Sequence, residues 1–385
     1  MKKLFIYTLA LVLAVPAFIS CSDDDKKKDI PEEDFKNYPY SSLSPEKQKE
    51  KLIVDGKSVI AQLDGLSQAK SIELLLSFQD LVEIDDPQLP NSPAIGKNVI
   101  YVNDFNGTYT WNKEAQKWDK TADANKLSFV LPAKRGGTTN NGKIEITGVS
   151  AGVNLSGYEL PKEAQIVLNA DNAEVGTISI KATEVSAEKA PKTATIKMNL
   201  DNGYTLDLAA EKGSTNVASF QFKKGDVTIL GGTADLSGNV DVAELGKGNA
   251  EVKILNNLVI WGNVDIENIN KEVAILDEAY DSVENYTEAI EKKYEEDWCA
   301  IMNRYSDIKL SSREDKTKIA SLSYGVKEDV YTYNGLKEDV VFKNYDSVMF
   351  LKFNDNTSVE ASVYFGTGFD SVLSVWNDFV NKFNK

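Results

Sequence analysis

Carboxylates are the main groups in this chain that could do chemistry, because histidine is absent from all 385 residues. Its absence excludes Ser-His-Asp and Cys-His catalysis, His-ligated zinc and the usual pH switch. Four acids crowd one stretch of the sequence, namely Glu291, Glu295, Glu296 and Asp297. Two facing carboxylates could serve a glycan hydrolase, one as acid and the other as base or nucleophile. A solvated helix face explains the same spacing, and we favour it, so the sequence predicts no catalytic residue.

The chain has two cysteines, Cys21 and Cys299. Cys299 follows Trp298 in an apolar helical pattern, and no histidine is present to activate it. We therefore expect a buried, small hydrophobic side chain rather than a nucleophile. If Cys21 is modified, no intrachain disulfide can form. The sequence predicts no cofactor.

Two Asp/Asn clusters, 169–172 and 354–356, resemble calcium ligands in composition. Neither is followed at the right distance by the Gly and terminal Glu of a helix-loop-helix calcium site. Asn and Asp favour turns because they bond their own backbone, so we predict turns here and assign no metal ligand. A calcium site built across loops stays open. The Gly-rich stretches 230–232 and 245–248 lack the spacing of a phosphate-binding loop and are also predicted to be turns.

Two tryptophans are candidates for glycan stacking. A short reversal at 113–116 would set Trp111 opposite Trp118. Exposed indoles could stack on sugar rings. The alternative, which we favour, is a cross-strand aromatic pair that stabilises a hairpin by roughly 0.2–1 kcal/mol.

The N-terminal residues carry the most specific signal. Lys2 and Lys3 precede an apolar run from Leu4 to Ile19, which ends at the small residue Ser20. The run is shorter than the roughly 20 residues that a membrane span needs. Residues 1–20 are therefore predicted to be a secretory signal peptide.

The segment that follows decides the predicted location. Ile19-Ser20-Cys21 resembles the lipobox of bacterial lipoproteins, in which the cysteine is acylated and becomes the mature N-terminus. The acidic run is similar to the export signal of surface-exposed lipoproteins of the Bacteroidota; it comprises Ser22, Asp23, Asp24 and Asp25. The resemblance covers only the first two dozen residues. It implies a lipid such as palmitate on Cys21, an outer-membrane anchor and exposure to the cell exterior. Ordinary secretion with a free Cys21 is the alternative.

Charge limits the other partners. The chain has 43 basic and 59 acidic residues, a formal net charge of −16. A polyanion repels nucleic acid and anionic lipid headgroups, so we predict no nucleic-acid partner and membrane contact only through the lipid anchor. With 42% hydrophobic residues, the chain can bury a core.

The expected architecture is α+β. Residues 21–43 are predicted to be a lipidated, flexible tether. Ser44 should cap a helix that runs to about residue 64, and Ser67 a second, buried helix that runs to about residue 83. From about residue 98 to 266, period-2 patterns predict an antiparallel meander, a curved sheet. A three-residue loop at 201–203 should pair Met198 with Leu206 and Ile196 with Leu208.

The C-terminal part is expected to begin with one long helix, from about 271 to 305, which spans roughly 50 Å. Strands are predicted at 318–325, 330–333, 340–342, 348–353 and 359–365. The last two should pair Phe353 with Val359 and Lys352 with Glu360. The ten-residue echo of 325–330 in 335–340 suggests two similar turns. A helix after Gly368 should dock on the sheet.

The predicted units are therefore 1–20, 21–43, 44–266 and 267–385, the last two either separate or packed as one. The first functional hypothesis is a non-enzymatic surface lipoprotein that binds or presents a glycan, a nutrient or a partner protein. The second is a carrier or chaperone for an apolar ligand, with a curved sheet wrapping helices, an analogy at fold level. The third is a carboxylate-based glycan hydrolase. A fimbrial subunit is a fourth, which the long helices oppose.

Overall fold

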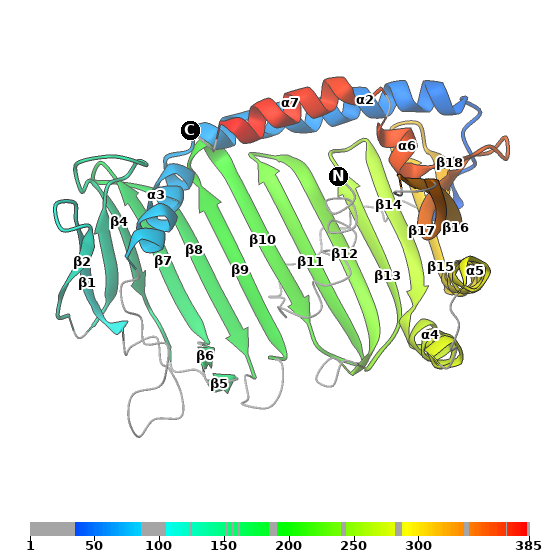
Figure 1. The fold of residues 1–385 in the computed structure, drawn as a ribbon. Helices are drawn as coiled ribbons and strands as arrows, with labels where there is room; N and C mark the ends of the chain where they lie inside the picture. The colour runs from blue at the N-terminus through cyan, green and yellow to red at the C-terminus, as the bar shows by residue number, and fades with distance from the viewer. Residues whose placement is uncertain are drawn as a thin grey trace.

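The computed structural model describes residues 35–85, 105–123, 125–150, 153–155, 158–160, 162–184, 191–239, 244–281, 287–334, 339–366 and 368–382. These residues form helices and a large, mostly antiparallel open sheet, so the fold is α+β, as predicted. Figure 1 shows the sheet with helices α2 and α7 along one side, α3 over one end and α4 and α5 near the other.

The sheet has 16 strands, and two further short strands, β5 and β6, pair separately. The strands are β1 Gly107–Asn112, β2 Lys117–Thr121, β3 Leu127–Leu131, β4 Gly142–Thr147, β5 Val153–Leu155, β6 Tyr158–Leu160, β7 Glu163–Ala170, β8 Ala173–Thr183, β9 Thr193–Leu200, β10 Tyr204–Glu211, β11 Thr215–Lys224, β12 Val227–Asn239, β13 Glu244–Ile254, β14 Leu258–Asp265, β15 Ser306–Ser312, β16 Thr317–Asn334, β17 Asp339–Lys352 and β18 Ser358–Glu360. The α-helices are α2 Pro45–Leu63, α3 Lys70–Ile84, α4 Ile266–Asp281, α5 Glu288–Tyr305, α6 Ala361–Gly366 and α7 Asp370–Asn381. Three short 3-10 segments are η2 Phe35–Asn37, η3 Asp64–Gln68 and η5 Asp201–Gly203.

Strand order follows chain order from β7 to β18, so the predicted meander is confirmed in outline. One pair departs from it, because β1 runs parallel to β3. The sheet also continues without a break from β14 to β15. Residues 44–266 and 267–385 therefore contribute strands to one sheet.

The turn between β9 and β10 shows how loops position helices here. Met198 pairs with Leu206 and Ile196 with Leu208, as the three-residue loop predicted. Asp201 in this loop accepts hydrogen bonds from the backbone N–H groups of Lys70, at 2.7 Å, and Ser71, at 3.0 Å. These are the first N–H groups of α3, which a helix leaves unsatisfied. The predicted cap, Ser67, instead lies in η3 and donates to the carbonyl of Asp64. The cap comes from 130 residues away, which local sequence cannot reveal.

The folded body begins before the predicted helix. Ser44 does cap α2, accepting from the N–H of Lys47. However, Phe35 is already buried and packs on Trp261, with ring centroids 5.5 Å apart. Tyr40 forms a parallel bridge with Lys318 of β16. The predicted tether 21–43 is therefore too long at its C-terminal end, because its last residues are anchored on β14 and β16.

The predicted long helix is two helices, α4 and α5, that pack against each other. Thr287 caps α5 through the N–H of Ile290. Tyr280 and Tyr294 meet edge-to-face at 5.2 Å, and Arg304 forms an ion pair with Glu272 at 2.7 Å. Residues near the end of α5 thus contact residues near the start of α4, so the helices are antiparallel. The apolar residues keep helical spacing on both sides of the break, so the sequence pattern did not reveal that there are two helices.

The C-terminal strands are fewer and longer than predicted. The segments 318–325 and 330–333 lie in the single strand β16, and 340–342 and 348–352 lie in β17. Residues 325–330 are therefore extended rather than a turn; the segment 335–338 of the second copy of the echo lies outside the described residues. Residues 361–365 form the helix α6 instead of a strand.

The last hairpin is shifted by two residues relative to its prediction. Leu351 pairs with Val359 and Lys352 with Ser358, so the predicted Phe353–Val359 and Lys352–Glu360 pairs are wrong. The N–H of Phe353 bonds the carbonyl of Thr357, which closes a tighter loop. Glu360 instead lies 3.8 Å from Lys327.

Helix α7 packs on α2 rather than on the sheet, contrary to the prediction (Figure 1). A Cβ at Gly56 of α2 would lie 3.1 Å from Cγ1 of Val372 on α7, so glycine permits a close approach of the two helices. Lys382, just after α7, also forms an ion pair with Asp64.

The Gly-rich stretches lie inside strands instead of in turns. Gly232 in β12 pairs with Val252, and Gly248 in β13 pairs with Leu236. A Cβ at Gly232 would lie 2.6 Å from the ring of Phe220, and one at Gly248 would lie 2.7 Å from the side chain of Leu236. Glycine in a strand can mark such a close approach, in which a large neighbour covers the backbone.

Candidate functional site

One face of the sheet carries rows of apolar side chains in register across seven strands. The row of large side chains contains Ile180, Ile196, Leu208, Phe220, Val252 and Ile260 on β8–β11, β13 and β14. On β12 this row has Gly232, which Phe220 covers. Next to it runs an alanine row, formed by Ala182, Ala194, Ala210, Ala218, Ala234 and Ala250. At about 4.8 Å per strand, the row of large side chains, over seven strands, is about 29 Å long, and the alanine row, over six, is about 24 Å long.

These rows lie on the same face as the helices. Met198 and Phe222, one pleat above the row of large side chains, pack on the same buried cluster as Val59, Leu63 and Ile72 of α2 and α3; its buried members are Leu200, Tyr204 and Ile229. None of the apolar clusters that lie within the described residues includes Ile180, Ile196, Leu208 or Phe220. All four are only partly buried. The opposite face of the same strands carries polar residues, for example Lys197 and Asp207.

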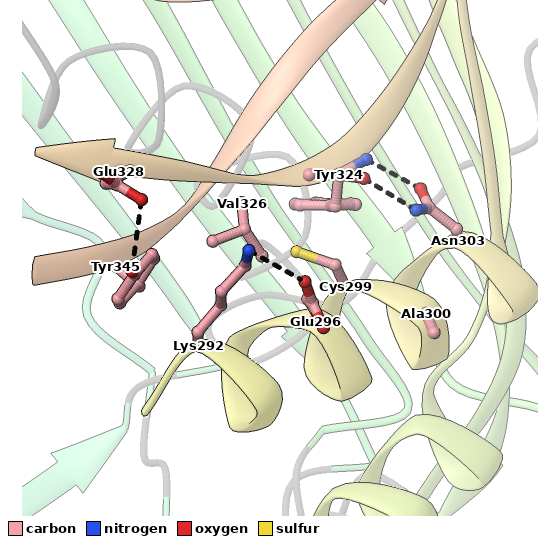
Figure 2. Close-up of a pocket in the computed structure, with 10 residues that line it drawn as sticks. Lys292, Glu296, Cys299, Ala300, Asn303, Tyr324, Val326, Glu328 and Tyr345 are labelled. Atoms are coloured by element: carbon pink, nitrogen blue, oxygen red, sulfur yellow. Dashed lines mark hydrogen bonds and ion pairs between the residues drawn. The ribbon is translucent and has the colours of Figure 1, made fainter. Parts of the chain in front are cut away.

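A cleft of about 490 Å³ lies between α5 and the ribbon of β16 and β17 (Figure 2). Its lining is Lys292, Glu296, Cys299, Ala300, Asn303, Tyr324, Gly325, Val326, Glu328 and Tyr345. Trp298 meets Tyr324 edge-to-face at 5.5 Å, which fixes α5 on the ribbon.

Cys299 is buried, as predicted, and it is a poor nucleophile. Burial raises the pKa of its thiol above the ordinary value. Its Sγ lies 3.3 Å from Oγ of Ser347, which also donates to the carboxylate of Glu295. Cys299 therefore remains a thiol at neutral pH.

The acids of α5 are engaged individually. Glu295 accepts from the hydroxyl and the N–H of Ser347, and Asp297 forms an ion pair with Lys293. Glu296 lies 3.9 Å from Lys292. Across the cleft, Lys343 donates to Glu328 at 2.6 Å and lowers the pKa of that carboxyl. The acids were predicted to lie on a solvated face of α5. In addition, one of them, Glu295, contacts the ribbon through Ser347.

The tyrosines of this cleft are held in their protonated form. Burial, and then the nearby Cys299, raises the pKa of Tyr324. Burial also raises the pKa of Tyr345, whose hydroxyl donates to Glu328 at 3.1 Å. The cleft therefore offers neutral phenols and a neutral thiol, which suits binding better than proton transfer near pH 7.

A second cleft, of about 710 Å³, lies beside the first and shares Asn303 with it. It is lined mainly by polar residues, among them Lys247, Asn249, Asn263, Asp265, Asn268, Arg304, Tyr305 and Asp307. Asp265 accepts from the side chain of Asn268 at 2.8 Å and lies 3.1 Å from Lys247. Hydrogen bonds from Asn268 and Lys247 lower the pKa of Asp265, against the effect of burial, the largest single influence.

Trp111 and Trp118 do face each other, at a centroid distance of 5.3 Å. Their exposed fractions are only 6% and 8%, and Trp118 packs on Phe78 and Phe129. No open indole face remains for a sugar ring, so the stacking hypothesis does not hold for this pair. The pair belongs to the core between α3 and the first strands.

The Asp/Asn clusters are turns. Asp171 and Asn172 have φ angles of 55° and 64° between β7 and β8, and Asn356 has a φ of 64°. Asp355 accepts from the N–H of Thr357 at 2.9 Å. Within the described ranges, no group of three or more Cys, Asp or Glu side chains is arranged to hold a metal ion.

The predicted lipidation residue Cys21 and the export residues 22–25 lie outside the described residues. Among the helices of the described part, none is both long and apolar enough to cross a membrane.

The apolar rows could not be found from single strands. Alternation marked the apolar face of each strand, but small residues such as Ala210 and Ala218 become one row only through the register of neighbouring strands. The role of Asn303 could not be predicted from sequence either, because it depends on where β15 begins to pair with β16.

Comparisons with known proteins add little. No family model and no curated protein matches this sequence. One solved structure with some likeness is a porin-like protein from Bacteroides vulgatus, at 7% identity and a TM-score of 0.17, over 66% of this chain and 88% of that chain. That likeness is too weak to carry an argument about fold or function.

Proposed function

We propose that this protein is a lipoprotein of the outer membrane that faces the cell exterior and binds an apolar ligand without catalysis. The anchor is a lipid on Cys21, and the acidic run 22–25 directs surface export. The sequence of these residues supports both assignments.

The observation that carries the binding role is the partial exposure of the row of large side chains on the apolar face. Each Å² of apolar surface left in water costs about 25 cal/mol, so a sheet normally covers such side chains with helices. Here α2 and α3 cover the adjacent pleat, whereas Ile196, Leu208 and Phe220 remain partly exposed. A ligand with an apolar surface would remove these side chains from water and so gain that free energy.

The electrostatics support binding over hydrolysis. A retaining or inverting glycosidase needs two facing carboxyl groups about 5–9.5 Å apart, one of which stays protonated near neutral pH. The carboxyl of Glu328 has a lowered pKa, and Glu295 and Asp297 are engaged by Ser347 and Lys293. Glu295 thus holds α5 on the ribbon, whereas Asp297 is paired within α5 and Glu328 within the ribbon.

A polar ligand such as a glycan is the second candidate. The supporting observation is the second cleft, where side-chain amides such as Asn263 and Asn268 lie beside Asp265 and Arg304. Such groups form the paired hydrogen bonds that sugar hydroxyls require. A glycan array with the unlipidated Cys21→Ser chain tests this candidate.

The ligand test uses the same unlipidated chain. Native mass spectrometry should show a bound apolar molecule that organic solvent releases. Leu208→Lys places a charge in the row of large side chains and should abolish the bound mass. Ala209→Lys is the matched control, because Ala209 is the next residue of β10 and faces the polar side. An equal bound mass in both variants would contradict an apolar site on this face.

The anchor has a separate test. Cells grown with labelled palmitate should label the parent protein and leave Cys21→Ala unlabelled. Equal labelling would refute the lipobox assignment. Protease added to intact cells should degrade the parent, and a protected protein would refute surface exposure.

A further inference from the structure

One edge of the sheet is open within the ribbon of β16 and β17. Strand β15 pairs with β16 only as far as Ile308 and Leu322, whereas β17 pairs with β16 to its end. From Ser323 onward, β16 therefore has a strand on one side only. The two outer edges of the sheet are protected differently: β2 carries Lys117, Asp119 and Lys120, and β18 has three residues. Charge and shortness both discourage pairing at an edge.

Asn303 shows which way the open edge faces. Its side-chain amide donates to the carbonyl of Tyr324 at 2.8 Å and accepts from the N–H of Tyr324 at 2.7 Å. It thereby takes the place of a strand partner, since the pairing of β15 with β16 stops at Ile308 and Leu322. Figure 2 shows both hydrogen bonds. The N–H and carbonyl of Tyr324 thus point outward from the ribbon.

Alternate residues of a strand direct their N–H and carbonyl groups to the same edge. Val326, Glu328 and Val330 therefore present theirs to the edge that Tyr324 shares with Asn303. The pairing of β16 with β17 has no shift in register here. In the described part of the chain, no hydrogen bond is made to these outward main-chain groups.

The edge of β17 is different because α5 covers it. Glu295 accepts from the N–H of Ser347 and Glu288 from the N–H of Lys343, both at 3.1 Å. Helix α5 thus crosses the ribbon from the edge of β17 to that of β16, where Asn303 satisfies one residue. Beyond it, the edge of β16 borders the first cleft, whose lining includes Val326 and Glu328.

Exposed apolar side chains lie on both faces of the ribbon toward its end. Val330 is 58% exposed, Tyr331 55%, Val341 56% and Phe342 53%. Tyr331 and Phe342 are directly opposite each other. An edge with unpaired main-chain groups and exposed apolar side chains is a template for another strand.

We propose that the edge of β16 from Val326 to Val330 binds an extended peptide segment of another protein by strand addition. A row of alternating N–H and carbonyl groups matches only a polypeptide main chain, which identifies the partner's chemistry. The segment carries apolar side chains against Val326 and Val330. It also carries a basic side chain beside Glu328, whose carboxylate is shared with Lys343, because the chain as a whole has a formal net charge of −16.

A second copy of this chain is the competing occupant of the edge. A two-fold axis through Glu328 or Lys327 places like charges opposite each other, which destabilises a strand pair. An axis through Val330 pairs Val330 with Val330 and Glu328 with Thr332, so the test includes the oligomeric state of the free chain.

The test uses the unlipidated Cys21→Ser chain and a short, end-capped synthetic peptide, Val-Thr-Lys-Thr-Val, whose valine and lysine side chains share one face, as Val326, Glu328 and Val330 do. Val326→Pro removes one outward N–H and leaves the bonds to β17 in place, since proline is tolerated where its N faces away from the ladder. We expect peptide affinity to fall roughly fivefold to tenfold, the effect of losing about one hydrogen bond. Val326→Thr keeps the N–H and is the matched control.

A second measurement keeps the proposal falsifiable if Val326→Pro does not fold. A peptide with N-methylated valines cannot donate to the edge and should bind the parent chain far more weakly than the unmethylated peptide. In ¹⁵N-valine spectra, the unmethylated peptide should shift the amides of Val326 and Val330. Three results would overturn the proposal. The first is equal affinity for both peptides, and the second is shifts confined to other valines. The third is a dimer of the free chain in sedimentation that the peptide does not dissociate.

Discussion

Asn303→Ala tests whether a side chain continues the hydrogen bonding of the sheet beyond the first residue of β15 that pairs with β16, Ile308. The change removes the hydrogen bonds to the N–H and carbonyl of Tyr324, at 2.7 and 2.8 Å. Each bond contributes about 0.5–1.5 kcal/mol net, and Asn303 is exposed, so water recovers part of the loss. Asn303 lies in α5, where alanine is favoured over asparagine by roughly 0.5 kcal/mol. The net expected loss of unfolding free energy is about 1 kcal/mol.

The matched control is Asn270→Ala, at an exposed position of α4. It has the same gain in helix propensity without the two bonds, so it should stabilise the chain by about 0.5 kcal/mol. Urea denaturation of both variants measures the difference, which should be about 1.5 kcal/mol. Amide exchange at Tyr324 should also become faster in Asn303→Ala alone. If Asn303→Ala is as stable as Asn270→Ala, the side chain does not act as part of the sheet.

Three further predictions concern other parts of the fold. Asp201→Ala removes the cap of α3 and should lower the free energy of unfolding, measured in urea, by about 1–2 kcal/mol. Asp226→Ala, in an exposed turn, is the control and should be near neutral; equal effects would contradict the capping role. Burial raises the pKa of Asp55 above its ordinary value of 3.8. The folded state therefore binds this proton more readily than the unfolded state, and stability should fall as pH rises from 3.8 through the raised pKa. Asp55→Asn should flatten the pH profile of stability in that window, and an unchanged slope would count against the assignment. Cys299 should react with iodoacetamide at pH 8 far more slowly in the folded chain than in urea, and equal rates would show that the thiol is accessible.

Sequence patterns predicted local structure well where the forces are local. The cap Ser44, the loop after Leu200 and the facing of Trp111 and Trp118 each depend on neighbouring residues. The predictions failed where distant residues decide. Asp201 caps a helix far away in sequence, and Phe220 covers Gly232 from the adjacent strand, so glycine there extends a strand.

The candidate sites were hidden for the same reason. The row through Ile196, Leu208 and Phe220 exists only because the registers of three strands align. The open edge of β16 exists because β15 is shorter than its neighbour. Neither relation can be predicted from a single stretch of sequence. The proposed lipobox can be predicted from sequence because it is a linear motif.

The most direct test of the proposed function is equilibrium binding of a fluorescent long-chain fatty acid to the unlipidated Cys21→Ser chain. We predict saturable binding to this chain and to Ala209→Lys, with affinity lowered roughly tenfold or more in Leu208→Lys. Failure of the unlipidated parent chain to bind the fatty acid, or equal binding to both lysine variants, would contradict an apolar ligand site on the helix-bearing face of the sheet.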